Sequence, residues 1–185
     1  GSRIVNNIFA NVGKRDPNDP ATDTGLAYGV LIVRGGEIAV ENNVFYKVED
    51  IGILANEFTG FGTYRNNIFL DNGVGIRLRG GIMPGSSSTG VIVDYNMFYG
   101  NQEDFVILLG EETYLDHLPT GNCMGGPAPG NPACDPRFVN AAAYDFHLQA
   151  SSPAINAADP LSPVPVGGGA RRDIGRFESG AATPP

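Results

Sequence analysis

Three arginines, Arg34, Arg77 and Arg79, stand out in a chain that is otherwise acidic. The 185 residues include 12 Lys and Arg against 20 Asp and Glu, which gives a formal net charge of −8. A guanidinium group pairs with a carboxylate through two parallel hydrogen bonds. Together with Asn56, the arginines therefore form a candidate binding surface for an acidic ligand. The alternative is that they only balance neighbouring Asp and Glu residues.

A second group of polar residues lies in the segment from residue 13 to residue 25. It carries three carboxylates, those of Asp16, Asp19 and Asp23. Hard oxygen ligands clustered on a turn-rich loop suit Ca²⁺, although their order does not match an EF-hand loop. The sequence predicts either a calcium site here or a solvated turn set by the prolines.

Three further charged residues, Glu41, Arg65 and Asp94, each stand two residues before an asparagine of a repeated motif. If successive repeats stack, their side chains lie in one column. Opposite charges on neighbouring strands stabilise a sheet, so the column is interpreted as an ion-pair ladder. The alternative is a pair of catalytic carboxylates two strand spacings apart, or about 9 to 10 Å. That separation lies near the upper end for inverting glycosidases.

No stronger catalytic motif is visible in the sequence. The only histidines are His117, in a predicted loop, and His147, near the C-terminus. No Ser-His-Asp arrangement can therefore be argued, and the catalytic residues are left unassigned. The function must be inferred from the surface that the fold creates.

An internal repeat positions these candidate residues. Counted from the last asparagine of each copy, the copies are separated by 36, 24 and 29 residues. The repeat predicts a structure in which each unit buries its apolar face against its neighbours. The four copies are Asn6-Asn7-Ile8-Phe9, Asn42-Asn43-Val44-Phe45, Asn66-Asn67-Ile68-Phe69 and Tyr95-Asn96-Met97-Phe98.

Each repeat contains short β-branched runs bounded by Gly, Asn and Asp, which is typical of strands. Strands that recur once per repeat, without hairpin turns, pair with the same strand of the next repeat. This predicts a parallel coil that rises about 4.8 Å per turn. Equivalent side chains then stack. The sequence predicts an internal aromatic column and an amide ladder, formed by Phe9, Phe45, Phe69 and Phe98 and by Asn7, Asn43, Asn67 and Asn96.

Two insertions, within 13–25 and 80–89, flank one predicted sheet and make it the floor of a trough. Alternation along its strands places Ile76 and Leu78 inward, so Arg77 and Arg79 face out. Such outward columns suit a long sugar chain that lies along the stacking axis. The two columns expected are Arg34, Asn56 and Arg79, and next to them Ile32, Leu54 and Arg77.

This repeat pattern resembles the right-handed parallel β-helix of the pectate-lyase-like superfamily over roughly residues 3 to 110. The tail resembles the closing segment of secreted, surface-anchored bacterial β-helix proteins. The resemblance implies an all-β fold, a right-handed single-stranded parallel β-helix of about four to five turns. We expect the turns in 3–118, a C-terminal closing segment in 119–178 and a linker in 179–185. The tail phrases are Asp135-Pro-Arg-Phe-Val139, Asp145-Phe-His-Leu148, Ser152-Pro-Ala-Ile155 and Asp173-Ile-Gly-Arg-Phe-Glu178.

The resemblance implies a protein that binds or processes polysaccharide. Lyases of the family use a Lys or Arg base, and the candidates for that role here are Lys14, Lys47, Arg34 and Arg79. A catalytic form would be a lyase or glycoside hydrolase acting on an acidic glycan. The alternative is a non-catalytic structural or adhesive domain of a larger surface protein, because one fold hosts many functions.

The two cysteines, Cys123 and Cys134, bracket a loop rich in Gly and Pro. A disulfide across so short a loop would constrain it by roughly 3 kcal/mol. It would also indicate an extracellular, cell-surface or periplasmic location. The alternative is a pair of free thiols.

Charge and composition bound the possible partners. The net charge of −8 argues against nucleic acid, and no apolar run is long enough to predict a membrane span. Stacked strands need their end edges covered. We therefore expect upstream repeats or a capping partner at the N-terminal end, with polysaccharide as the ligand.

Overall fold

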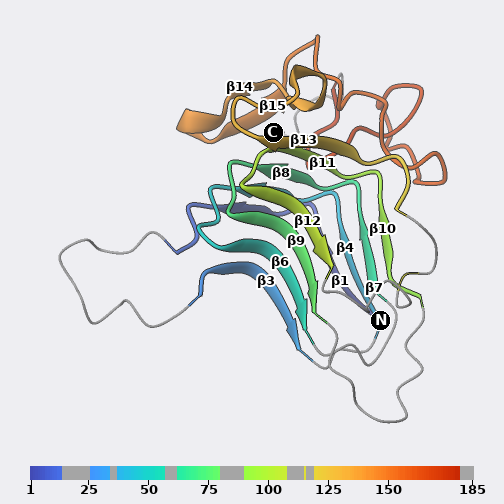
Figure 1. Cartoon of the computed structure of the whole chain (residues 1–185). Coiled ribbons are helices and arrows are strands. Elements are labelled where there is room, and N and C mark those ends of the chain that lie inside the picture. Colours follow the sequence, from blue (N-terminus) through green and yellow to red (C-terminus); the bar gives the residue numbers. More distant parts are fainter. Residues whose placement is uncertain are drawn as a thin grey trace.

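The computed structural model describes residues 1–13, 26–33, 37–56, 62–79, 90–107, 115 and 119–179 (Figure 1). Asn56 is described by its backbone alone. The predicted calcium ligands Asp16, Asp19 and Asp23 lie outside the described residues, as does Arg34. These assignments stay predictions.

The described part of the chain is built from short strands, of which the longest have six residues. In chain order they are β1 (Ser2–Val5), β2 (Ile8–Ala10), β3 (Tyr28–Val33), β4 (Ile38–Glu41), β5 (Val44–Tyr46), β6 (Ile51–Asn56), β7 (Gly62–Arg65), β8 (Ile68–Leu70), β9 (Val74–Arg79), β10 (Ile92–Asp94), β11 (Met97–Gly100), β12 (Glu103–Ile107), β13 (Cys123–Pro127), β14 (Phe138–Asn140) and β15 (Asp145–Leu148).

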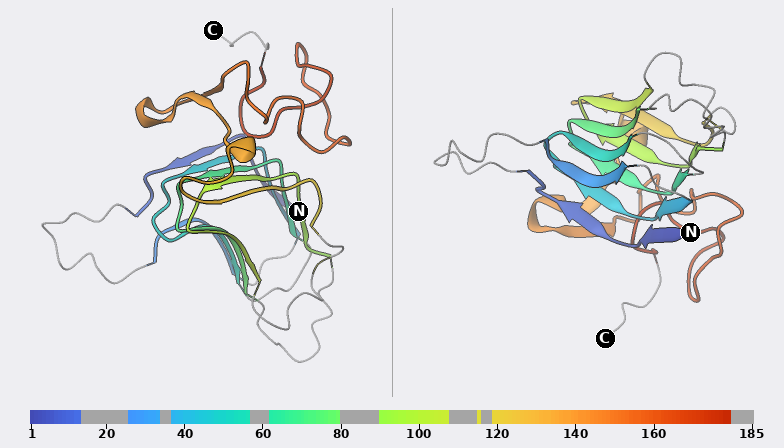
Figure 2. Two further views of the ribbon diagram at one scale, coloured as in Figure 1. Left: turned by 45° about the horizontal axis from the view of Figure 1, so that its top comes forward. Right: turned by 90° about the horizontal axis from the view of Figure 1, so that it is seen from below.

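The first thirteen strands form three parallel sheets, called A, B and C. Successive strands along the chain belong to different sheets, in a repeating order. Sheet A has the order β1-β4-β7-β10, sheet B the order β13-β11-β8-β5-β2 and sheet C the order β12-β9-β6-β3. Each strand thus pairs in parallel with the equivalent strand of the next repeat. Figure 2 shows the strands of each sheet stacked one behind another. The predicted all-β class with parallel pairing is confirmed.

A tight corner between sheets A and B explains why asparagine recurs in pairs. The first residues of three pairs, Asn6, Asn42 and Asn66, have φ values of 59°, 55° and 57°, in the left-handed region that Asn tolerates. The second asparagine forms the ladder: Asn43 donates from its Nδ2 to Oδ1 of Asn67 at 3.1 Å. The predicted amide ladder is confirmed and gains a fifth member. It runs through Asn7, Asn43, Asn67, Asn96 and Asn122.

A second, shorter amide ladder lies at the corner between sheets B and C, and the sequence analysis missed it. Asn72 donates from Nδ2 to Oδ1 of Asn101 at 2.9 Å, and its own Oδ1 accepts from the backbone N–H of Val48 at 2.8 Å. Asn101 in turn donates to the buried carboxylate of Asp104 at 3.1 Å. Both corners of sheet B are therefore held by buried amides, and buried polar groups with partners rigidify a fold.

The core between the sheets contains the predicted aromatic column, which is confirmed. Ring centroids are 4.8 Å apart from Phe9 to Phe45 and from Phe45 to Phe69, and 4.9 Å apart from Phe69 to Phe98. The rings need space on sheet C, because a Cβ atom on Gly52 would collide with the ring of Phe69. A glycine column therefore runs beside the rings, formed by Gly29, Gly52 and Gly75.

The C-terminal strap, residues 128–179, folds back along the outer face of sheet B, where it lies above β8 and β11 in Figure 1. Its β14 and β15 pair in antiparallel fashion. Phe146 and Ile174 of the strap pack with Val44, Ile68 and Met97 of the sheet, and all five are buried. The strap thus completes a second core on the outside of sheet B.

Polar contacts from the first asparagine of each pair hold the strap in place. Asn66 donates to Oγ of Ser162 at 2.9 Å and accepts from the backbone N–H of Asp159 at 2.8 Å. At the N-terminal repeat, Arg172 donates to Oδ1 of Asn6 at 3.2 Å. The strap therefore runs back from the last repeat to the first.

Two further sequence predictions concern residues near the start of the strap. Cys123 of β13 and Cys134 of a 3-10 turn (Pro132–Cys134) form the predicted disulfide. Because β13 pairs with β11, strand stacking continues past residue 118. Within the described ranges, no helix is long and apolar enough to cross a membrane.

Candidate functional site

The outer face of sheet C carries the predicted arginines. Ile76 and Leu78 are 0% and 2% exposed in the core, so Arg77 and Arg79 project outward, as expected from strand alternation. Arg77 lies opposite Leu54 in the strand register, and Arg79 lies opposite Asn56. The sequence analysis therefore placed these two outward columns correctly over β6 and β9.

The predicted columns were wrong by one residue in the first repeat. Val33, and not Arg34, is the register partner of Asn56, and Leu31, and not Ile32, is the partner of Leu54. The physical reason is the glycine column, because Gly29 must stand beside Phe45 as Gly52 stands beside Phe69. The first repeat thus contributes apolar side chains to these columns: Leu31 and Val33 are 48% and 50% exposed.

Arg77 is partly fixed and partly available for a ligand. Its Nη2 lies 3.3 Å from a carboxylate oxygen of Glu103 on the neighbouring strand β12. Its Nε is shielded from solvent and has no hydrogen-bond partner in the described part of the chain. Because this atom is closed to solvent, a ligand would meet Arg77 through the part of its side chain that is 34% exposed.

Apolar side chains surround the arginines on this face. Ile51, Leu54 and Val74 form a small cluster, against which Tyr28 and Val106 pack. The same face is hollowed into two shallow depressions of about 500 and 430 Å³. Both are lined by Ile51, Arg77 and Glu103, so they adjoin one another.

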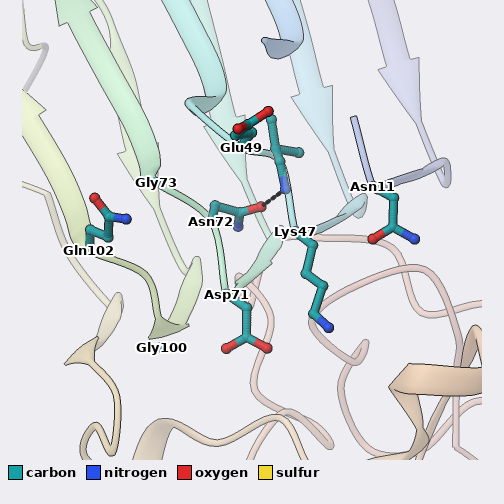
Figure 3. A pocket seen from close by; sticks show the side chains of 9 residues that line it. Asn11, Lys47, Glu49, Asp71, Asn72, Gly73, Gly100 and Gln102 are labelled. Atoms are coloured by element: carbon teal, nitrogen blue, oxygen red, sulfur yellow. Dashed lines mark hydrogen bonds between the residues drawn. The ribbon is translucent and has the colours of Figure 1, made fainter. Parts of the chain in front are cut away.

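A third depression, of about 580 Å³, lies at the corner between sheets B and C (Figure 3). In Figure 3 the side chains of Lys47 and Asp71 leave this corner toward the same side, whereas Glu49 points the other way. Among the described residues, no ion pair or hydrogen bond joins Lys47 to Asp71. The lining residues are Asn11, Lys47, Val48, Glu49, Asp71, Asn72, Gly73, Gly100 and Gln102.

The residues at the turn of this corner all have left-handed backbone. Asn11, Lys47, Asp71 and Gly100 have φ values of 52°, 52°, 56° and 69°. Asn, Asp and Gly tolerate this region, but a lysine there is strained by about 1 to 2 kcal/mol. Residues held in such conformations cluster at functional sites. Gly100 also makes room, because a Cβ atom there would collide with the carboxylate of Asp71.

The two charged groups of the corner have shifted pKa values. Contact with Tyr46 raises the pKa of the Lys47 ammonium group, and the charge of Asp71 adds to the effect. The Nζ of Lys47 lies 5.1 Å from the centre of the Tyr46 ring. Partial burial raises the pKa of Asp71, Lys47 opposes this rise, and Asp135 of the strap adds to it. Lys47 is therefore a cation at neutral pH, which does not suit a general base.

The corner pocket opens into the trough over sheet C. Glu49, Gly73 and Gln102 line both the corner pocket and the nearer depression of the trough. The three depressions thus form one groove, which runs from Lys47 at the corner to Arg79 at the far end of β9. We call it the outer groove.

The predicted Glu41-Arg65-Asp94 column lies elsewhere, on sheet A. Arg65 binds Glu41 at 2.7 Å and Asp159 of the strap at 2.8 Å, and Arg3 binds the second oxygen of Glu41 at 2.7 Å. This confirms the predicted ion pair between Glu41 and Arg65. Asp94 stands opposite Arg65 in register and accepts from the backbone N–H of Thr120 at 2.8 Å. The arrangement favours ion pairing over catalysis.

Other candidate groups make local contacts. Nδ1 of His147 lies 2.7 Å from Asp145, and its ring packs against Phe177 in the strap. Within the described ranges, no three His, Cys, Asp or Glu side chains are arranged to hold a metal ion. The corner pocket was not predicted, although Lys47 was named as a candidate base. The sequence signal of this pocket is the residue at the C-terminal end of each strand of sheet B. Asn11, Lys47 and Asp71 follow β2, β5 and β8, and Gly100 is the last residue of β11.

Comparison of the chain with protein-family models, with curated proteins and with solved structures finds no match in any of the three.

Proposed function

We propose that the chain is a right-handed parallel β-helix that binds polysaccharide along the outer groove. The observation that carries the proposal is the row of three adjoining depressions along sheet C and its corner. A long polymer needs an extended groove with repeated contacts, whereas a small ligand needs one enclosed cavity. The groove follows the direction of β9, so successive sugar units would meet successive side chains along β6, β9 and β12.

The side chains of the groove fit a glycan with acidic units. Arg77 and Arg79 can pair with carboxylates through their exposed parts. The partly exposed Tyr28 and the exposed side chains of Leu31 and Val33 offer apolar surface to the faces of sugar rings. Lys47 is protonated, so its role in this proposal is to bind a ligand and not to abstract a proton.

A β-helix with a structural or adhesive role is the second candidate. The observation that favours it is the ion-pair network of Arg65, which engages Glu41, one of the two carboxylates considered for catalysis. The disulfide supports an extracellular or periplasmic setting for either candidate. A calcium ion held by Asp16, Asp19 and Asp23 would help to bind an acidic glycan, because the ion would bridge these carboxylates and those of the glycan.

The test is a titration of the protein with oligosaccharides of alginate, pectate and glycosaminoglycans, with and without Ca²⁺. We expect at least one acidic glycan to bind, and high salt to weaken the binding because the contacts are electrostatic. Arg79→Ala should lose a charge-assisted contact worth about 1.5 to 3 kcal/mol. Arg176→Ala is the matched control, because Arg176 is exposed on the strap.

Turnover separates an enzyme from a binding domain. Elimination of a uronate creates a conjugated double bond that absorbs in the ultraviolet, whereas hydrolysis creates only reducing ends. Binding without either product would identify a glycan-binding domain. Neither binding nor turnover with any glycan of the panel would support the structural candidate instead.

A further inference from the structure

The corner pocket differs in charge from the arginine end of the outer groove. The carboxylate of Asp71 lies on the same side of the corner as Lys47, and the charge of Asp135 reaches Asp71 from the strap, whereas Glu49 points the other way. Carboxylates therefore outnumber cations at the corner, whereas Arg77 and Arg79 outnumber Glu103 at the far end. Like charges repel in a partly desolvated site, so an acidic sugar unit fits the arginine end better than the corner.

Lys47 and Asp71 place a hydrogen-bond donor and an acceptor on the same side of the corner. Both side chains leave the corner in that direction (Figure 3), and the charge of each influences the other. An ammonium group only donates hydrogen bonds and a carboxylate only accepts them. A sugar hydroxyl can do both at once, so adjacent hydroxyls can satisfy the two groups together. An aliphatic or purely anionic group cannot.

The surroundings of the pair support a sugar. Tyr144 of the strap is 56% exposed, and its hydroxyl accepts a hydrogen bond from Asn11, which lines the pocket. Amphipathic aromatic rings present an apolar face and a polar tip together. The volume of about 580 Å³ lies within the range of sites for small ligands. Gly100 keeps the space beside the Asp71 carboxylate open.

We infer that the corner pocket binds an uncharged sugar unit through Lys47 and Asp71, while the arginine end of the same groove binds an acidic unit. This inference rests on the proposed glycan-binding function and specifies its substrate class. The ligand is then a heteroglycan in which neutral and acidic units occur together. A uniformly acidic polymer would fill only the arginine end favourably.

Two ligand sets separate this inference from the proposed function. Calorimetric titration uses neutral oligosaccharides (gluco-, manno-, xylo- and galacto-series) as one set and oligogalacturonates and alginate oligosaccharides as the other. We expect Lys47→Met and Asp71→Asn each to weaken binding of a neutral oligosaccharide about ten- to hundredfold, as loss of hydrogen bonds to a charged group predicts. Salt should change this binding little, because the ligand carries no charge.

Matched variants control for folding and for the other end of the groove. Glu37→Gln removes an exposed carboxylate on the side of sheet A and should leave both ligand sets unaffected. Arg79→Ala should weaken binding of the acidic set alone. Lys47 and Asp71 are both exposed, so their variants should unfold at the same urea concentration as the parent protein.

The outcomes are distinct. Acidic ligands that bind through Arg79, with no neutral ligand bound, would overturn the inference and leave the proposed function intact. Neutral ligands that bind the Lys47 and Asp71 variants as tightly as the parent would also overturn it. Binding of neither set would overturn both.

Discussion

Adjacent asparagines in this protein have different roles, and Asn66 and Asn67 show the difference most clearly. Asn66 has left-handed backbone and points outward, where it holds Ser162 and Asp159 of the strap. Asn67 points inward, is fully buried, and links Asn43 to Asn96. Buried amides with partners stabilise a fold, whereas buried amides without partners destabilise it. Asn66 therefore holds the strap against the sheets, whereas Asn67 holds neighbouring repeats together.

Replacement of Asn67 by alanine should lower the free energy of unfolding by about 1 to 3 kcal/mol, because Asn43 then loses a buried partner. Asn7→Ala is the matched control, since Asn7 is the exposed end of the same ladder and donates to Asn43 and to the backbone carbonyl of Val5. Its loss should be clearly smaller. Urea unfolding of both variants measures the difference, and equal losses would contradict the role given to the ladder.

The buried ion pairs of Glu41 predict a pH dependence. Burial alone would raise the pKa of Glu41, but hydrogen bonds and charges from Arg3 and Arg65 outweigh burial and lower it below the ordinary value of 4.5. A lowered pKa in the folded state means that the ionised carboxylate stabilises the fold above that value. This contribution is lost as the pH falls from 4.5 through the folded pKa.

Glu41→Gln should therefore cost about 1.5 to 3 kcal/mol at neutral pH, the range for hydrogen bonds to charged groups. The difference from the parent should shrink as the pH is lowered below 4.5, because the parent then loses the same interactions. Unfolding by urea at a series of pH values measures it, with Glu37→Gln as the exposed control. A difference that stays constant across the series would rule out the ion-pair account.

Among the elements, the strap and sheet B depend on each other. Sheet B presents Val44, Ile68 and Met97 outward, and these side chains are buried only because the strap covers them. The strap has one short antiparallel strand pair of its own, β14 with β15. A strand pair of this size is not independently stable in water. The strap and the sheet should therefore unfold together.

Phe146→Ala tests this coupling, because Phe146 is 1% exposed and packs on Tyr46 and Phe138. We expect the free energy of unfolding to fall by about 3 to 5 kcal/mol, with a single transition by near- and far-ultraviolet circular dichroism. Val166→Ala, at a fully exposed strap position, should change it by less than about 0.5 kcal/mol. Two separate transitions in either protein would show that the strap folds independently.

For the whole molecule, the stacking of the strands was predicted from the sequence more accurately than the outer groove. The 29-residue spacing between Asn67 and Asn96 of the main ladder recurs between Asn72 and Asn101 of the second ladder, because every element of a repeat shares one stacking period. The register of β3 could not be counted back from the asparagine pair, since the connections between sheets C and A differ in length. The register of β3 is instead set by Gly29, which must lie beside a phenylalanine ring as Gly52 and Gly75 do.

The corner pocket could not be predicted from any one residue. Lys47 and Asp71 are 24 residues apart, and they become neighbours only because β5 and β8 are adjacent in sheet B. The contribution of Asp135 depends on the return of the strap, which no repeat spacing encodes. Sites that combine a repeat with a non-repeating segment are therefore visible only in the folded structure.

The central claim is that a glycan lies along the outer groove, and NMR titration of isotope-labelled protein with the best-binding oligosaccharide tests it most directly. The claim predicts shifts of backbone amide signals in Lys47, Gly73, Arg77 and Glu103 and in their neighbours along the groove. Signals of sheet A, such as Ala39 and Thr63, should stay in place as internal controls. Shifts confined to sheet A or to the strap, or no shifts with any glycan of the panel, would contradict the account.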